Sequence, residues 1–142
     1  MTPLDLTKAP PRSPRQELHG LCMLPRMIDI ARAMLLGGEV GDYQIGRGVS
    51  RPVLATFALT TSQFVEIVRD ATTDREVAKR LLSNTKGPLK ALDRRLRSLT
   101  VADVPEELRV EFHQLYGRDL PLDRLVFDVL EADDAQKFGA QA

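Results

Sequence analysis

The stretch LPRMIDIARAML, residues 24–35, decides the fold of this chain. Its apolar residues recur three and four positions apart, the spacing of one face of an α-helix. Those residues are Leu24, Met27, Ile28, Ala31, Met34 and Leu35. Arg26, Asp29 and Arg32 lie on the other side, close enough to form ion pairs along the helix. Gly37 and Gly38 follow, and glycine tolerates the left-handed conformation of a helix end. We therefore predict an amphipathic helix that ends before residue 37.

Toward the N-terminus, prolines divide the chain into two further segments. Pro10 and Pro11, with Pro3 before them, lack a backbone donor, so residues 1–12 are expected to form an extended arm. A helix is predicted from Ser13, because Pro14 suits the first helical position and Gln16 follows at capping-box spacing. Pro25 is expected to end or kink that helix, which would fold the two helices into a hairpin.

Toward the C-terminus, glycine and capping residues mark a series of short helices. Residues 37–48 hold five glycines and predict a loop, with room for one short strand near Tyr43. Further helices are expected near residues 50–57, 60–71, 73–82, 89–99, 103–116 and 121–130. Three of them begin with residues at capping-box spacing, which are Thr60 with Gln63, Thr73 with Glu76, and Asp103 with Glu106. For residues 126–129 a strand remains an alternative, because β-branched and aromatic residues gather there. Residues 133–142 are polar and predict a frayed tail.

These segments predict an all-α fold. Residues 1–142 suit one domain with a single core, built as a bundle of seven or eight short helices with an extended N-terminal arm. The leucines of the 89–99 segment could pack internally or against a second copy, so both a monomer and a homodimer stay open. Internal packing is the preferred interpretation, because one domain needs most of its apolar faces for its own core.

Composition excludes several classes of protein. No stretch approaches the roughly 18 apolar residues of a membrane span, and the N-terminus lacks the apolar core of a signal peptide. We therefore expect a cytoplasmic protein without membrane contact. One cysteine cannot form an internal disulfide, and two histidines with one cysteine are too few for a structural zinc site. The sequence also lacks a Gly-rich phosphate loop and a nucleophile elbow, so no metal, cofactor or catalytic residue is predicted.

Two local patterns are candidates for chemistry. His19 and Cys22 are three residues apart, as a thiol–imidazole pair would be on one helical face. Cys22 also completes the apolar spacing of its segment, and a buried structural cysteine is the preferred interpretation. Residues 86–97 carry five basic groups against one acidic group, whereas residues 103–134 carry ten acidic groups against three basic ones. Nucleic-acid binding through Lys86–Arg97 is disfavoured, because the whole chain has no net charge.

A set of arginines near the N-terminus is the best candidate for a binding site. Arg12 and Arg15 flank the expected helix start, and Arg26 and Arg32 surround Asp29 on the next helix. Guanidinium groups suit carboxylates and phosphates, so a helical hairpin would gather them into an anion site. The alternative, which we favour, is that they pair with Asp5, Glu17, Asp29 or acidic residues of the C-terminal half.

Several motifs of the N-terminal half resemble a known family. They are Asp5 to Lys8, Pro10 to Arg15, Leu24 to Asp29, Ala31 to Ala33, Gly41 to Tyr43 and Phe64 to Leu82. Together they resemble a bacterial domain-of-unknown-function family, numbered fifty sixty-nine, over roughly residues 4–82. That family has a Cys-Pro-Leu-Asp segment shortly after the tyrosine, but residues 47–50 of this chain read RGVS. A thiol or carboxylate role at that segment therefore cannot operate here.

The resemblance implies no known activity, but it places the candidate site residues in a shared signature. These residues are Arg12, Arg15, Arg26, Asp29, Arg32 and Tyr43, together with Asp5. We expect a small non-enzymatic helical module that binds a partner protein or an anionic small molecule. An enzyme of unknown reaction, with a site around Arg26, Asp29, Arg32 and Tyr43, is the second hypothesis, and nucleic-acid binding is the third.

Overall fold

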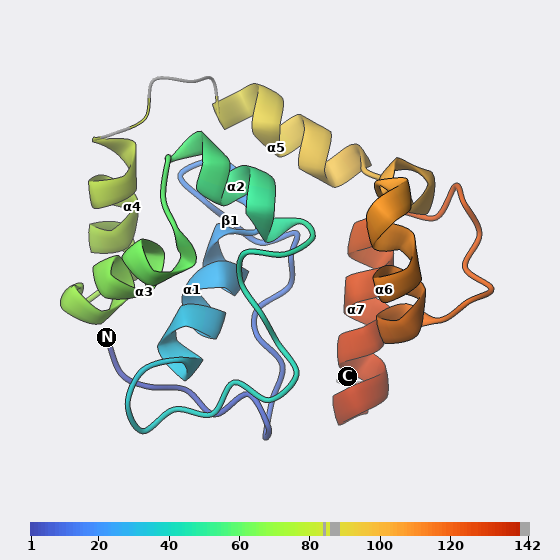
Figure 1. Ribbon diagram of the computed structural model, residues 1–142. Helices are drawn as coiled ribbons and strands as arrows, with labels where there is room; N and C mark the ends of the chain where they lie inside the picture. Colours follow the sequence, from blue (N-terminus) through green and yellow to red (C-terminus); the bar gives the residue numbers. More distant parts are fainter. Residues whose placement is uncertain (84, 86–88, 140–142) are drawn as a thin grey trace.

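The computed structural model describes residues 1–83, 85 and 89–139. Within these residues the chain forms seven α-helices, one short 3-10 helix and one two-stranded hairpin, which confirms a mostly helical single domain (Figure 1). The elements are β1 (Glu17–Leu18), β2 (Leu21–Cys22), α1 (Leu24–Ala33), α2 (Ser50–Thr56), α3 (Thr61–Asp70), α4 (Asp74–Leu82), α5 (Leu89–Ser98), η1 (Val101–Asp103), α6 (Glu106–Tyr116) and α7 (Val126–Phe138). In the described part of the chain, no helix is long and apolar enough to cross a membrane.

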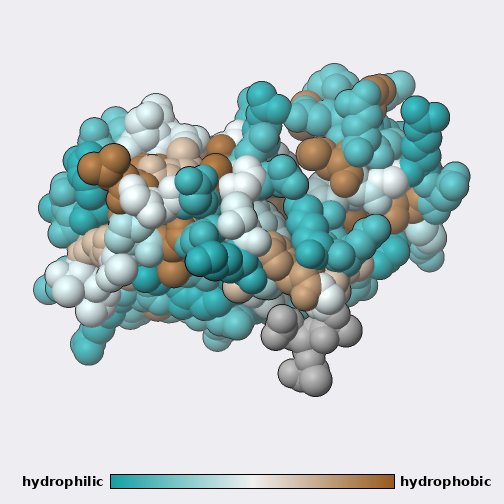
Figure 2. All heavy atoms as spheres, turned by 90° about the horizontal axis from the view of Figure 1, so that it is seen from below, coloured by the Kyte–Doolittle hydropathy of each residue, from teal (hydrophilic) through white to brown (hydrophobic). Residues whose placement is uncertain are grey.

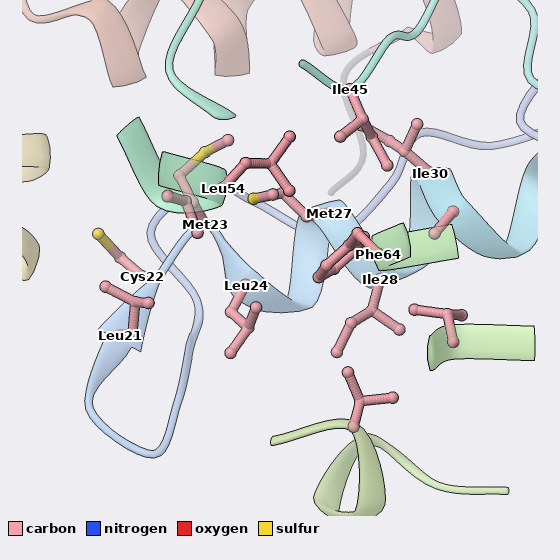
Figure 3. Close-up of a cluster of buried hydrophobic side chains, with 14 of the residues drawn as sticks. Leu21, Cys22, Met23, Leu24, Met27, Ile28, Ile30, Ile45, Leu54 and Phe64 are labelled. Atoms are coloured by element: carbon pink, nitrogen blue, oxygen red, sulfur yellow. The ribbon is translucent and has the colours of Figure 1, made fainter. Parts of the chain in front are cut away.

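Helix α1 lies at the centre of the core. All its residues except Arg32 are buried, including Arg26 and Asp29, which were expected on the side opposite the apolar face. Met27 and Ile28 are fully buried in one hydrophobic cluster with Phe64 of α3 (Figure 3). The helix ends as predicted, and Gly37 follows it with a φ of 90°. The sequence therefore predicted the position of the helix correctly, but not the burial of its charged residues.

The predicted helix from Ser13 is wrong, because this segment forms the β1–β2 hairpin. His19 and Gly20 make the turn with φ values of 52° and 80°, a backbone conformation that a helix excludes. The capping pattern at Ser13 makes only one local turn, in which the Ser13 hydroxyl accepts a hydrogen bond from the Arg15 amide. Pro25 does not break a helix. It lies in the first turn of α1, where its missing N–H has no partner to lose.

The N-terminal arm and the glycine-rich loop lie against each other. Asp5 forms a parallel bridge with Glu39, and Leu6 is buried in the core. No strand forms near Tyr43, which lies in an irregular segment with its ring buried. The expected backbone pairing in this loop is therefore confined to the single bridge at Glu39.

Helices α2, α3 and α4 begin where the sequence predicted them. Thr60 and Gln63 form a complete capping box at α3, with hydrogen bonds of 3.1 and 2.9 Å. At α4 the Thr73 hydroxyl accepts a hydrogen bond from the Glu76 amide, but the Glu76 carboxylate accepts one from the Thr72 amide instead. Side-chain caps thus start both helices.

The last three helices close the other side of the molecule. Helix α5 crosses from the α3–α4 side to the α6–α7 side, where α6 and α7 lie next to each other (Figure 1). The predicted cap of α6 by Asp103 is not formed, because Asp103 caps η1 by accepting hydrogen bonds from Thr100. Residues 126–129 are helical rather than a strand.

The frayed tail predicted for residues 133–142 is wrong for its first part. Helix α7 continues to Phe138, and Asp134 is only 8% exposed. The polar sequence suggested solvent, but the Asp134 carboxylate is held by buried partners on other elements. Residues 140–142 of the predicted tail lie outside the described residues.

Candidate functional site

Arg12 and Asp29 form the first of two ion-pair groups, in which Asp29 is buried and Arg12 is partly exposed. The Arg12 side chain donates to both Asp29 oxygens, at 3.1 and 3.0 Å, and to Asp74 of α4 at 2.7 Å. The Arg12 amide also donates to Asp29, at 2.8 Å. Burial opposes the charge of this guanidinium, but the hydrogen bonds with Asp74 and Asp29 raise the pKa of Arg12 above its ordinary value. The group therefore joins the arm, α1 and α4.

Arg26 forms the second group with Asp134 of α7. Its two terminal nitrogens donate to the two Asp134 oxygens, at 2.7 and 3.0 Å, so the pair is bidentate. The Tyr43 hydroxyl donates to the same carboxylate at 2.8 Å, and the Arg26 guanidinium lies 5.4 Å from the Tyr43 ring centre. Burial and the neighbouring Asp134 raise the pKa of Tyr43, so its hydroxyl keeps its proton. Three residues from different segments thus make one closed polar cluster.

Arg15 contacts the same helix nearer its start. Its guanidinium pairs with Asp128, at 2.6 Å, and with Glu131, and it lies over the Phe127 ring. The Ser13 hydroxyl donates to Glu131 as well, at 2.9 Å. The segment that precedes the hairpin therefore faces the acidic side of α7.

The structure brings most, but not all, of the six predicted site residues together. Arg26 donates to the Arg12 carbonyl at 3.2 Å, and this hydrogen bond links the two ion-pair groups. Asp29 belongs to the first group and Tyr43 to the second. Arg15 joins through α7, whereas Arg32 is separate and donates to the Thr2 carbonyl at 2.7 Å. The guanidinium groups of Arg12, Arg15 and Arg26 face carboxylates, as the favoured alternative expected. The sequence did not identify Asp74 and Asp134 as the partners of Arg12 and Arg26, because nothing in the local sequence marks such a pairing.

A pocket opens beside the second ion-pair group. It has a volume of about 460 Å³ and lies between α1, residues 41–50, α6 and α7. Figure 2 shows an indentation between the two sides of the molecule, with hydrophobic side chains at its edge. The apolar residues of its wall are Met23, Met27, Ile30, Val49, Val104, Leu108, Phe112, Leu115 and Leu130. Most of this wall is apolar, and it belongs to segments that are far apart in the sequence.

The wall of the pocket also contains polar and charged groups. Arg26 and Tyr43 line the pocket, and the Lys137 ammonium lies 4.6 Å from the Tyr43 ring centre. Lys137 pairs with Asp133 at 3.0 Å, while Arg47 and Glu111 make an ion pair of 2.6 Å between the loop and α6. Three basic residues (Arg26, Arg47, Lys137) and three acidic ones (Asp42, Glu111, Asp133) line the pocket, so its formal charge is zero.

The pocket was not predicted from the sequence. Of the six predicted site residues only Arg26 and Tyr43 line it. Its other side comes from residues 104–137, where the sequence showed amphipathic helices and an acidic bias but no motif. Among the residues that the structure describes, no group of three or more His, Cys, Asp and Glu side chains is arranged to hold a metal ion.

Comparison with known proteins places the chain in a family without a described activity. The sequence model of a family described as "Domain of unknown function (DUF5069)" matches residues 8–100. The match includes Arg12, Arg26, Asp29 and Tyr43, but it ends before α6 and α7. No protein in the curated set matches the chain. The expected resemblance is confirmed, because the match spans more than half of the sequence, and the chain belongs to the DUF5069 family.

Proposed function

We propose that this protein is a small binding module for an organic anion with an apolar body. The observation that supports this is the pocket of about 460 Å³ between α1, residues 41–50, α6 and α7. Pockets for small molecules are concave, mostly apolar, and of roughly 300–1,000 Å³, with a few polar groups that orient the ligand. This pocket has the same character, so a small molecule fits it better than a flat protein surface would.

The apolar wall favours a ligand with a hydrocarbon or aromatic body. Met27 and Ile30 come from α1, Phe112 from α6 and Leu130 from α7, so apolar side chains face the space from both sides. Each CH₂ group removed from water on such a wall contributes about 0.8 kcal/mol. A body of several carbon atoms would therefore supply most of the binding free energy.

The polar part of the wall favours one anionic group on the ligand. Lys137 can turn toward a ligand, because its side chain is 31% exposed and its partner Asp133 lies on the same helix, whereas Arg47 is paired across the pocket with Glu111 of α6. The Tyr43 ring lies beside it, and the Arg26 guanidinium lies 5.4 Å from the centre of the same ring. Since the charges of the lining balance, a polyanion would meet as much repulsion as attraction, whereas a single carboxylate or sulfonate can pair with Lys137.

The proposal is tested with an anionic fluorescent probe and a matched pair of variants. Leu115 and Leu122 are both 58% exposed, but only Leu115 lines the pocket. Leu115→Glu places a carboxylate in the pocket wall, so we expect it to weaken binding of anilinonaphthalene sulfonate about tenfold or more. Leu122→Glu, the control, should bind like the wild type. Equal losses in both variants would contradict the proposal.

Competition separates the two parts of the proposed ligand. Octanoate should displace the probe from the wild type better than octanol, which has the same body without the charge. Lys137→Ala should remove this difference and leave octanol competition unchanged. If octanol and octanoate compete equally well in the wild type, the pocket recognises only an apolar body. The proposal that the ligand carries an anionic group would then be wrong.

The other sequence hypotheses receive less support from the structure. The proposed enzyme site would need Asp29 and Arg32 in the cleft, but Asp29 is paired with Arg12 and Arg32 reaches Thr2. For nucleic-acid binding, Arg97 is already paired with Asp93 and Glu17, and Lys86 lies outside the described residues. A cytoplasmic location, a bacterial source, a partner protein and the choice between monomer and homodimer remain predictions from the sequence.

A further inference from the structure

We propose that Arg26 and Tyr43 form a carboxylate-binding site, and that Asp134 of α7 is its resident ligand. Removal of the Asp134 side chain would leave a site for a small monocarboxylate such as formate or acetate. This inference does not depend on an organic ligand in the pocket. It concerns the buried cluster beneath the pocket wall.

The geometry of the cluster is that of carboxylate recognition. Arg26 supplies two parallel N–H groups at 2.7 and 3.0 Å, and the Tyr43 hydroxyl supplies a third donor at 2.8 Å. Arg26, Tyr43 and Asp134 are 4%, 8% and 8% exposed, so these donors are removed from competing water. A planar fork of two donors selects a carboxylate over a spherical anion, because both oxygens must be met at once.

The hydrogen-bond donors of the site are on segments other than α7, and Arg26 is held in place by contacts that do not involve Asp134. Arg26 lies on the buried helix α1, and its guanidinium also donates to the Arg12 carbonyl at 3.2 Å. Arg12 is itself fixed by its bonds to Asp29 and Asp74. Both Arg26 and Tyr43 fall within residues 8–100, whereas Asp134 comes from a helix beyond that match. The donors therefore belong to the family domain and the carboxylate to a segment that follows it.

Three acidic residues on one face of α7 each form an ion pair with an arginine of the N-terminal segment. Asp128, Glu131 and Asp134 are spaced three apart, so they lie along one side of the helix. Asp128 and Glu131 meet Arg15, and Asp134 meets Arg26. Only the last contact is buried, since the side chains of Asp128 and Glu131 are 48% and 40% exposed. Asp134 is thus the one member of this face whose site excludes solvent.

Rescue of Asp134→Ala by formate tests the site. This variant leaves an empty space beside an unpaired buried arginine, so we expect a lower melting temperature than in the wild type. Formate can enter the space and bind the folded state, which should raise the melting temperature by about 5 °C or more when formate far exceeds its Kd. Sodium chloride at the same ionic strength should not have this effect. Asp128→Ala, which removes an exposed partner of Arg15, is the matched control and should not respond to formate.

The remaining outcomes are also decisive. Tyr43→Phe combined with Asp134→Ala should need more formate for the same rise, because one of three donors is lost. If Asp134→Ala does not fold in buffer, refolding should succeed in formate and fail in chloride. A variant that responds equally to formate and chloride, or refolds in neither, would show that Arg26 and Tyr43 do not bind a free carboxylate.

Discussion

Cys22 is buried in the core, and its surroundings keep its thiol protonated. Its amide donates to Asp93 at 2.7 Å, and its thiol lies 3.7 Å from the Asp93 carbonyl. Burial, together with Asp93, raises the pKa of Cys22 to about 12, so the thiol is protonated at neutral pH. His19 is exposed on the hairpin turn instead. The preferred interpretation of Cys22 as a structural residue therefore agrees with its environment.

At this scale we predict that Asp93→Asn lowers stability near neutral pH by about 1–2 kcal/mol. Burial acts to raise the pKa of Asp93, but hydrogen bonds from Arg97 and from Cys22 outweigh it and lower the pKa. The stability from this charge is therefore present above about pH 4, the ordinary aspartate value, and is lost as the pH falls through the lower pKa of the folded state. Urea denaturation at several pH values should show a shallower acid loss in the variant than in the wild type. The same acid slope in both chains would refute the assignment.

At the scale of elements, the β1–β2 hairpin depends on its two turn residues. His19 has a φ of 52° and Gly20 a φ of 80°. Two successive left-handed residues are typical of the tight turns that join antiparallel strands, where Asn followed by Gly is preferred. Histidine is not the best residue for this position, because its Cβ opposes a positive φ. The hairpin therefore carries a small strain at an exposed site.

We predict that His19→Asn stabilises the protein by about 0.5–1 kcal/mol, because asparagine adopts the left-handed conformation more easily. The midpoint of urea denaturation should rise without a change of slope. Gln16→Asn is the control, since residue 16 is also exposed and precedes the hairpin without a positive φ. A gain of the same size in the control would mean that turn geometry is not its cause.

At the scale of the whole molecule, charged groups join the family domain to the C-terminal helices. Arg26 with Asp134 and Arg47 with Glu111 both connect residues before position 100 with residues after it. They differ in burial: the Arg26 side chain is 5% exposed and the Arg47 side chain 67%. A buried charge without its partner is costly, whereas an exposed pair contributes little. The two pairs should therefore respond very differently to the same substitution.

We predict that Arg26→Ala destabilises the chain by about 3–5 kcal/mol, because Asp134 would be left buried and unpaired. Arg47→Ala, the matched control, should cost less than about 1 kcal/mol. Equilibrium urea denaturation measures both. Replacing both partners, as Arg26→Met with Asp134→Leu, should recover most of the loss, since the buried charge is then gone. Similar losses for Arg26→Ala and Arg47→Ala would contradict this role of burial.

How far the sequence could be interpreted depended on the range of the interactions involved. The capping box of Thr60 and Gln63 was predicted correctly, because both partners lie within one turn. The helix from Ser13 was wrong, although it began with the same kind of pattern, because the residues after it pack as a hairpin. The pairing of the arginines with carboxylates was foreseen as a class. Asp134 was not identified, because it lies 108 residues from Arg26.

By itself the sequence determined the helical class, most helix positions and the family, because periodicity, caps and motifs act over a few residues. Only the tertiary structure decided that Arg26 and Asp29 are buried, that α7 continues to Phe138, and that a pocket forms between α1 and α6. The physical reason is desolvation. Whether a charged side chain faces water or a partner depends on which distant segments of the chain come into contact in the fold. A local sequence pattern does not indicate those contacts.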